Sequence, residues 1–199
     1  MKIYYREKSG GIEILRCFGI EGRVEIPGMI DGKLVISAAP YAFSSHMDEK
    51  EELKNASLWE VSDGLEFGKE EHVLAGNDVE EMVFPYTLKE IGRYIFYGCG
   101  NLKKLEFSDS LMQIGCGAFT GCHALEKLTV HMRQGKKSGV KEMLGEMWQR
   151  IDVNFLYEYE EARLVFPEHY DEAVENTPAR ILYTCLLYTS PSPRDRSVS

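Results

Sequence analysis

Two stretches of the chain, FYGCGNLKKLEF (residues 96–107) and FTGCHALEKLTV (residues 119–130), follow nearly the same pattern. A shift of 23 residues places the aromatic, glycine and cysteine positions of the first on those of the second, in the pairs Phe96–Phe119, Gly98–Gly121 and Cys99–Cys122. A period of this length indicates a repeat architecture, in which each unit is one small structural element that stacks on the next.

The apolar residues around these stretches recur in the same register over three units. They form three columns, which are Val79–Leu102–Leu125, Met82–Leu105–Leu128 and Phe84–Phe107–Val130. Charged residues separate the columns, so each unit is expected to supply one short strand to a parallel sheet, with neighbouring strands about 4.8 Å apart. Gly98 and Gly121 would permit the tight turns that return the chain. We therefore expect Leu102, Leu105, Phe107, Leu125, Leu128 and Val130 to be buried.

These units resemble the BspA-type leucine-rich repeat family, whose units read roughly as a proline, a short spacer and then I-G-x-x-A-F-x-G-C-x-x-L-x-x-I-x-I. One unit runs from Phe84-Pro85 to Phe107, and a second runs from Phe107 to Val130 with Ser108 in place of the proline. The resemblance covers residues 12–45 and 79–131 and implies a leucine-rich repeat solenoid.

A variant unit precedes these two, in the stretch VEIPGMIDGKLVISAAPYAFSS (residues 24–45). It keeps Ile26-Pro27 and the Tyr41-Ala42-Phe43 core of the pattern. It departs from the pattern with Ala38 for isoleucine, Ala39 for glycine and Ser45 for cysteine. The segment around DGKLV is an insertion of the kind that first units of this family often carry.

The expected fold class is an α/β repeat. A short solenoid with one parallel strand per 23 residues would span residues 1–131, and a partial α/β module would span residues 132–184. In that module the apolar spacing predicts a helix over residues 140–150, followed by a hairpin over residues 151–166. The helix would present one apolar face, made of Val140, Met143, Leu144, Met147 and Trp148.

Residues 46–78 form an acidic insertion within the solenoid. Phe43 and Phe96 are two periods plus seven residues apart, and nine acidic residues crowd positions 48–71. Two interpretations stay open. The insertion is either a solvated loop or short helix that lies on the solenoid, or an acidic interaction surface.

The last residues, CLLYTSPSPRDRSVS (residues 185–199), do not follow from what precedes them. Back-translated, residues 185–195 resemble the end of a transposase-type sequencing adapter, so we expect an artefactual, disordered tail and a natural chain interrupted near Thr184. The formal charge of the whole chain is -9. Without the tail, which contributes two arginines and one aspartate, it would be -10.

The acidic balance makes nucleic acid and anionic membranes unlikely partners. The N-terminus, MKIYYREKSGGIEIL, has no apolar signal segment, and no stretch approaches the ~20 apolar residues of a membrane helix. We therefore expect a cytoplasmic protein with no membrane insertion. Reduced thiols are expected at Cys17, Cys99, Cys116 and Cys122.

No combination of residues predicts catalysis. The glycines around Cys99 and Cys116 recur with the repeat and lack the Lys-Ser/Thr of a phosphate-binding loop. Cys122-His123 is not read as a nucleophile and its base, because adjacent residues rarely face each other and Cys122 repeats Cys99. A metal site of Cys99, Cys116, Cys122 and His123 lacks any C-x-x-C pair. Glu158, Glu160, Glu161 and Glu168 are read as a solvated face. We expect no enzyme, no cofactor and no metal.

The resemblance implies binding roles without a shared ligand. We therefore expect a protein-recognition or scaffolding module with a protein partner, because solenoids present broad surfaces that suit macromolecules. The contacts would be made by exposed strand positions, which are Glu80, Glu81, Lys103, Lys104, Glu106, Glu126, Lys127 and Thr129. Two alternatives stay open: a regulatory or targeting arm of a longer enzyme, and a cell-surface adhesin-like protein.

Overall fold

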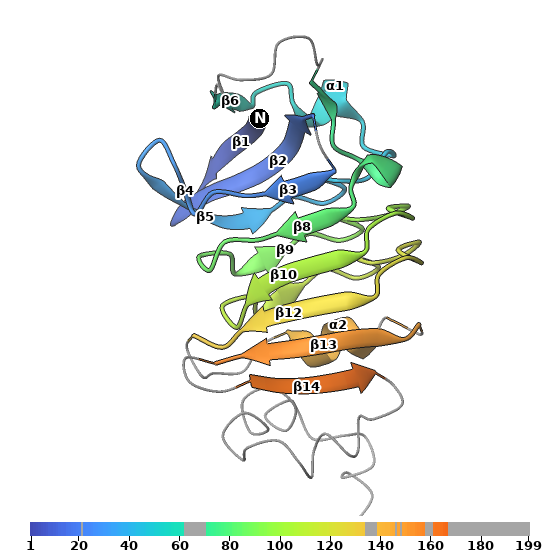
Figure 1. The fold of residues 1–199 in the computed structure, drawn as a ribbon. Helices are drawn as coiled ribbons and strands as arrows, with labels where there is room; N and C mark the ends of the chain where they lie inside the picture. Colours follow the sequence, from blue (N-terminus) through green and yellow to red (C-terminus); the bar gives the residue numbers. More distant parts are fainter. Residues whose placement is uncertain are drawn as a thin grey trace, which may run out of the picture.

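The chain folds as a stack of short strands that runs from the N-terminus downwards in Figure 1. The computed structural model describes residues 1–20, 22–61, 71–133, 139–145, 147 and 149–157, and the backbone of residues 161–166. Two sheets face each other across one continuous core, and we call them the front sheet and the back sheet after their positions in Figure 1.

The front sheet is built by the repeat. Its parallel strands lie in the order β3 (Arg23–Glu25), β8 (Glu81–Val83), β10 (Lys104–Ser108), β12 (Lys127–His131) and β13 (Ile151–Leu156). The antiparallel strand β14 (Glu161–Phe166) pairs with β13 and ends the order. Leu105 lies beside Met82 on one side and Leu128 on the other, as the 23-residue register predicts. The six residues expected to be buried are each at most 1% exposed.

The back sheet closes the other side of each turn. Its parallel strands are β2 (Gly11–Gly19), β5 (Lys33–Ala38), β9 (Glu90–Ile91) and β11 (Gln113–Ile114). At the N-terminal end the sheet continues with β1 (Lys2–Lys8) and β6 (Ser57–Glu60), both antiparallel to their neighbours, and β7 (His72–Val73) pairs with the end of β2. The DGKLV insertion forms a hairpin of β4 (Met29–Ile30) with β5, which projects from the stack in Figure 1.

A column of phenylalanines fills the core between the sheets. The rings of Phe43, Phe96 and Phe119 stack in successive turns, with centroids 5.5 and 5.7 Å apart. Gly98 and Gly121 have φ values of 77° and 87°, which a glycine adopts without strain, so the predicted tight turns are confirmed. The residues that recur in the sequence therefore make contacts that recur in the core.

Cys99 and Cys122 join each turn to the one before it. The thiol of Cys99 donates to the carbonyl oxygen of Phe43 over 3.2 Å, and that of Cys122 donates to the carbonyl oxygen of Phe96 over 3.3 Å. Both residues are buried free cysteines, as expected for core positions. The repeated cysteine thus satisfies a backbone acceptor in two successive turns.

The acidic insertion packs on the N-terminal end of the solenoid. Because β3 pairs directly with β8, the described part of the insertion adds no strand to the front sheet. It contains the short helix α1 (Glu49–Glu52), which buries none of its residues, the strand β6 and the 3-10 turn η1 (Gly76–Asp78). A short helix is therefore present, as one interpretation predicted, and the binding role of the insertion stays a prediction.

A buried arginine fixes this end of the molecule. Arg16 of β2 is 2% exposed, and its guanidinium donates to the carbonyl oxygens of Ala42 and Ser44 over 3.1 and 2.6 Å. It also pairs with the Glu49 carboxylate of α1 at 3.0 Å. Burial lowers the pKa of Arg16, and the Glu49 charge opposes that shift. One side chain thus connects the N-terminal hairpin, the first repeat turn and the acidic insertion.

The C-terminal elements continue the solenoid. The predicted helix is the shorter α2 (Val140–Gly145), which lies behind β12 and β13 in Figure 1 and buries Met143 and Leu144 in the common core. Met147 is also buried, whereas the side chains of Val140 and Trp148 lie outside the described residues. The predicted hairpin is present as β13 and β14, and β13 is also a parallel neighbour of β12. How the chain divides into domains stays a prediction, and the segment 185–199 lies outside the described residues.

Candidate binding surface

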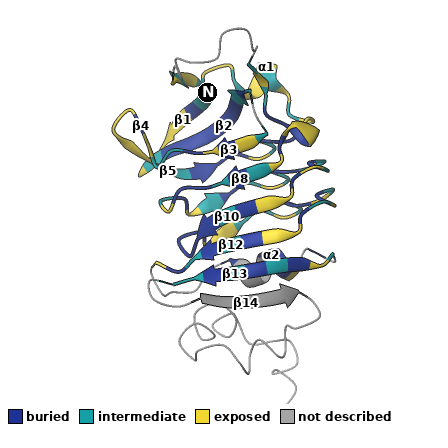
Figure 2. Ribbon diagram, viewed as in Figure 1, coloured by how far each residue is buried: buried dark blue, intermediate teal, exposed yellow. Residues whose placement is uncertain are grey.

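The outer face of the front sheet carries the residues that the sequence selected. Alternate residues of each strand point away from the core, so Figure 2 shows exposed and buried segments alternating along the strands. Glu80, Lys103, Lys104, Glu126 and Lys127 are exposed, and Glu81, Glu106 and Thr129 are half-buried. The structure therefore gathers all eight residues on or beside three neighbouring strands. Their role in binding stays a prediction.

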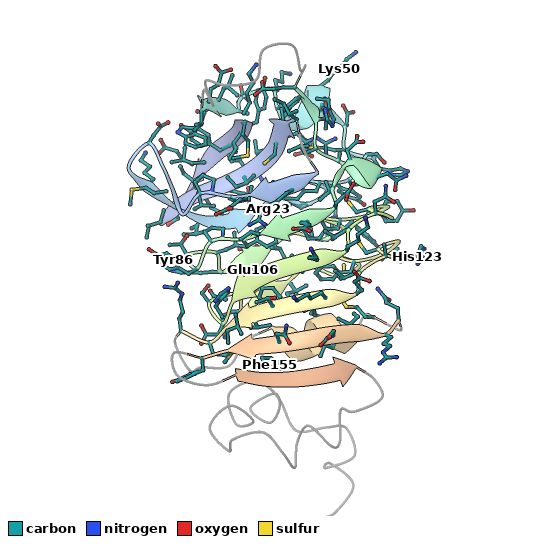
Figure 3. The ribbon with its side chains drawn as sticks, in the orientation of Figure 1. Arg23, Lys50, Tyr86, Glu106, His123 and Phe155 are labelled. Atoms are coloured by element: carbon teal, nitrogen blue, oxygen red, sulfur yellow. The ribbon has the colours of Figure 1, made fainter. Side chains whose placement is uncertain are left out.

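The outward side chains form two columns across the strands, which we call the charged columns. The first column contains Arg23, Glu81, Lys104, Lys127 and Asp152. The second column contains Glu25, Val83, Glu106, Thr129 and Asn154. Figure 3 shows two of their members, Arg23 and Glu106, on the front strands.

Much of the charge in and beside these columns is compensated between neighbouring strands. Lys103 pairs with Glu80 at 3.3 Å, and Lys104 pairs with Glu81 at 2.5 Å. Hydrogen bonding from Lys104 and the positive charges of Lys104 and Arg23 lower the pKa of Glu81. Exposed pairs of this kind contribute about 0–1 kcal/mol each, so they set the local charge pattern more than the stability.

Positive and negative charges alternate along the first column except between β10 and β12. Lys104 and Lys127 lie directly opposite each other on neighbouring strands. Two like charges in that position repel each other. Lys104 has Glu81 as its partner, whereas Lys127 forms no salt bridge with any described residue. The centre of the face therefore presents two adjacent positive charges, and the other cross-strand neighbour of Lys127 is Asp152 of β13, with which it makes no salt bridge.

Several members of this surface were not selected from the sequence. Arg23 and Glu25 belong to β3, and Asp152 and Asn154 belong to β13. His131 also lies on this side of β12, where its imidazole is 2.7 Å from the Glu106 carboxylate. The alternation of Ile151, Val153 and Phe155 did reveal a strand, but it did not reveal which strand lies beside it.

The back sheet carries a depression. An open groove of about 350 Å³ is lined by residues in or next to β2, β5, β9 and β11, among them Glu13, Glu90, Arg93 and Gln113. Glu13 is 5% exposed and is paired with Arg6 at 2.5 Å and Lys8 at 3.3 Å. Lys8 also reaches Glu90 at 3.0 Å. The two carboxylates of this groove are therefore both paired with basic side chains of β1.

The cysteines show no sign of nucleophilic activation. Burial raises the pKa of Cys99 from 9.0 to about 12 and also raises the pKa of Cys122. Cys122 is 2% exposed whereas its neighbour His123 is exposed, so the two side chains lie on different sides of the backbone. Buried thiols with a raised pKa are poor nucleophiles.

Among the residues that the structure describes, no group of three or more His, Cys, Asp or Glu side chains lies where it could hold a metal ion. No helix in the described part of the chain is both long and apolar enough to cross a membrane.

Comparison with known proteins identifies the central turns. Residues 70–139 match the family described as BspA type Leucine rich repeat region (6 copies). This segment is therefore a BspA-type leucine-rich repeat region, and the resemblance seen in its sequence is confirmed. No curated protein matches the chain.

A solved structure with some similarity is titled as the crystal structure of a leucine-rich repeat protein of T. pallidum. It is 23% identical to this chain, with a TM-score of 0.32, and the match covers 77% of this chain and 79% of that one.

Proposed function

We propose that the protein is a recognition or scaffolding module that binds a partner protein through the charged columns of the front sheet. The observation that carries this proposal is the pair of adjacent lysines, Lys104 and Lys127, at the centre of the front sheet, where Lys127 makes no salt bridge with a described residue. A carboxylate from a partner would complete the alternation of charge there. Complementary charges of this kind favour specific and rapid association.

The shape of the molecule supports a macromolecular partner over a small one. Small-molecule sites are mostly enclosed and apolar, whereas the front sheet is an open face of stacked strands with charged side chains. Leucine-rich repeat regions are typically not enzymes, and the raised pKa of Cys99 fits that expectation. The proposed role is therefore binding rather than catalysis.

The test compares partners captured by the full chain and by charge variants. Lys104→Glu together with Lys127→Glu inverts the charge at the centre of the front sheet. Lys89→Glu makes the same change at an exposed position beside the back sheet and is the matched control. Affinity purification from extracts of the producing cells, with quantitative mass spectrometry, measures what each variant retains.

We expect proteins that are enriched with the unchanged chain and with Lys89→Glu, and that are lost with the double variant. Equal recovery with all three chains would contradict a role for the charged columns. Both variants should keep the melting temperature of the parent, since each change lies at the surface.

We also propose a cytoplasmic location, supported by the four free cysteines among the described residues. Fractionation of the producing cells tests this, and recovery of the native protein in the surface fraction would favour the adhesin-like alternative instead.

A further inference from the structure

The turns that follow the front strands form one edge of the molecule, on the left of Figure 1. The turn after β10 is joined to its neighbours on both sides. The Ser110 hydroxyl donates to the carbonyl oxygen of Leu88 over 2.7 Å. The backbone N–H of Arg133, after β12, donates to the Asp109 carboxylate over 3.1 Å. Side chains on successive turns of this edge therefore keep a fixed spacing.

A contact between two of these side chains spans the middle turn. Tyr86 follows β8 and Arg133 follows β12, and the Arg133 Cζ lies 4.9 Å from the centre of the Tyr86 ring. Residues 108–110, in the turn between them, are at most 6% exposed. Tyr86 itself is 58% exposed, Arg133 is also exposed, and Figure 3 shows Tyr86 at this edge. The contact is therefore accessible to a partner.

The guanidinium of Arg133 has no carboxylate partner in the part of the chain that the structure describes. An arginine held over an aromatic ring still presents its N–H donors in a rigid fork, which matches the two oxygens of a carboxylate. Because the ring already orders this side chain, less conformational entropy is lost when the guanidinium binds. The edge thus presents one pre-organised cation that the described residues leave uncompensated.

Exposed apolar side chains gather on the same edge. Six large apolar side chains are exposed among the described residues, and four of them lie here, which are Met29, Leu34, Tyr86 and Met112. Met29 and Leu34 oppose each other on the β4–β5 hairpin. The Thr87 hydroxyl, from the turn after β8, joins that hairpin by donating to the carbonyl oxygen of Val35 over 2.7 Å. We call Met29, Leu34, Tyr86, Met112 and Arg133 the turn edge.

The chemistry of the turn edge defines its occupant. Tyrosine, methionine and arginine are enriched at protein interfaces, and one free guanidinium requires one carboxylate. A polyanion such as nucleic acid would be repelled by the net charge of -9. A second copy docked through the same five residues would supply no carboxylate, because the turn edge contains none. The complementary occupant is an apolar segment that carries a single acidic residue.

We propose that the turn edge binds an apolar segment of a partner protein whose one carboxylate pairs with Arg133. The apolar side chains of that segment would cover Tyr86 and Met112, which are now in contact with solvent. The turn edge shares no residue with the charged columns, so this proposal stands or falls independently of the function proposed for the front sheet.

The probe is a library of random short peptides displayed on phage and selected on the full chain. Each enriched peptide is then synthesised in two forms, one with its acidic residue and one with the corresponding amide, asparagine or glutamine. Fluorescence anisotropy measures the affinity of both forms for the full chain and for its variants.

The variants separate charge, fork and ring. Arg133→Gln removes the charge and keeps a polar side chain, whereas Arg133→Lys keeps the charge and removes the fork. Tyr86→Leu keeps an apolar surface and removes the ring beneath the guanidinium. Arg93→Gln changes an exposed arginine beside the back sheet in the same way, so it is the matched control. An unchanged melting temperature shows that each variant is folded.

We expect enriched peptides that contain one aspartate or glutamate among apolar residues. Arg133→Gln and the amide form of the peptide should each weaken binding by roughly tenfold or more, and the two changes together should weaken it little further. Arg133→Lys and Tyr86→Leu should weaken binding less. Arg93→Gln should leave it unchanged, and so should Lys104→Glu with Lys127→Glu.

The proposal would be overturned if no enriched peptide bound Arg133→Gln more weakly than the parent chain. Equal binding of the acid and amide forms would also overturn it, because the carboxylate would then have no role. Acidic peptides that are lost with Lys104→Glu and Lys127→Glu but kept with Arg133→Gln would assign the binding to the charged columns instead. A dimer of the free chain that Tyr86→Leu dissociates would identify a second copy as the occupant.

Discussion

The repeated turns at residues 79–131 and the N-terminal end at residues 1–61 solve the same problem in different ways. In the repeated turns each core residue packs against its own counterpart, as Phe96 does with Phe43 and Phe119. Beyond the turn that holds Phe43, the N-terminal end has no further turn to supply a counterpart, and single contacts such as those of Arg16 close the stack. A solenoid is therefore specified by repetition in its middle and by unique residues at its end.

The largest expected effect on stability comes from a substitution that disrupts the repeated packing. Leu105 is 1% exposed and lies between Met82 and Leu128 in the front sheet. Leu105→Ala should lower the free energy of unfolding by about 2–5 kcal/mol, because it removes buried methyl groups and leaves a cavity between two turns. Urea denaturation followed by circular dichroism measures this change.

Leu58→Ala is the matched control for this substitution, since Leu58 is 44% exposed at the N-terminal end. Its effect should stay within about 0.5 kcal/mol. Equal losses for the two variants would show that the Leu105 column is not core.

The next largest effect on stability is expected from a substitution at the N-terminal end. Arg16→Leu leaves the carbonyl oxygens of Ala42 and Ser44 without their donor, so it should cost about 1–3 kcal/mol per unsatisfied buried group. Arg93→Leu changes an exposed arginine of a repeated turn and should cost within about 0.5 kcal/mol. If Arg16→Leu were as mild as Arg93→Leu, the end would not depend on this single contact.

How far the sequence predicts this structure follows from the same contrast. The columns through Leu105 and Phe107 were predictable because each position recurs after 23 residues in the same register. The position of β13 beside β12 was not predictable, since the segment before it lacks the glycine and phenylalanine positions of the repeat, and the repeat pattern is no longer recognisable there. Arg16 looks like any surface arginine in the sequence, and only the fold shows that it is 2% exposed.

The candidate site was predictable to the same extent. Every surface residue that was predicted from the two clear repeats lies on one face of the front sheet. The surface residues on β3 and β13 were missed because they lie where the repeat pattern is weak or absent. The strand β6 gave no signal at all, because four residues without a period do not distinguish a strand from a loop.

A smaller effect concerns the thiols of the core. Burial raises the pKa values of Cys17 and Cys99 from 9.0 to about 12, so both stay protonated in the folded chain when the unfolded chain already loses these protons. The unfolded state then binds fewer protons, and stability should fall as pH rises from about 9 towards 12. Denaturation midpoints across that range check this.

The same burial should make Cys99 and Cys122 react slowly with a thiol reagent at neutral pH, whereas the exposed Cys116 should react readily. Mass spectrometry of the labelled protein, folded and in denaturant, compares the rates. Faster labelling of Cys122 in the folded chain than in denaturant would indicate an activated thiol and would return catalysis to consideration.

The last change is expected to leave stability unaltered. Deletion of residues 185–199 should leave the melting temperature unchanged within error, because we expect this segment to be foreign to the protein. Differential scanning calorimetry of the two chains decides this, and a marked destabilisation would show that the segment is native.

The central claim is that successive repeats lie parallel and in a 23-residue register, and one distance tests it directly. Spin labels at Lys104→Cys and Lys127→Cys, with Cys116→Ser to remove the exposed native thiol, would occupy directly opposed positions on β10 and β12. Continuous-wave EPR should then show strong dipolar broadening that disappears when either label is present alone. Sharp lines from the doubly labelled protein would place the two residues at opposite ends of their strands, as an antiparallel pairing would, and would contradict the repeat.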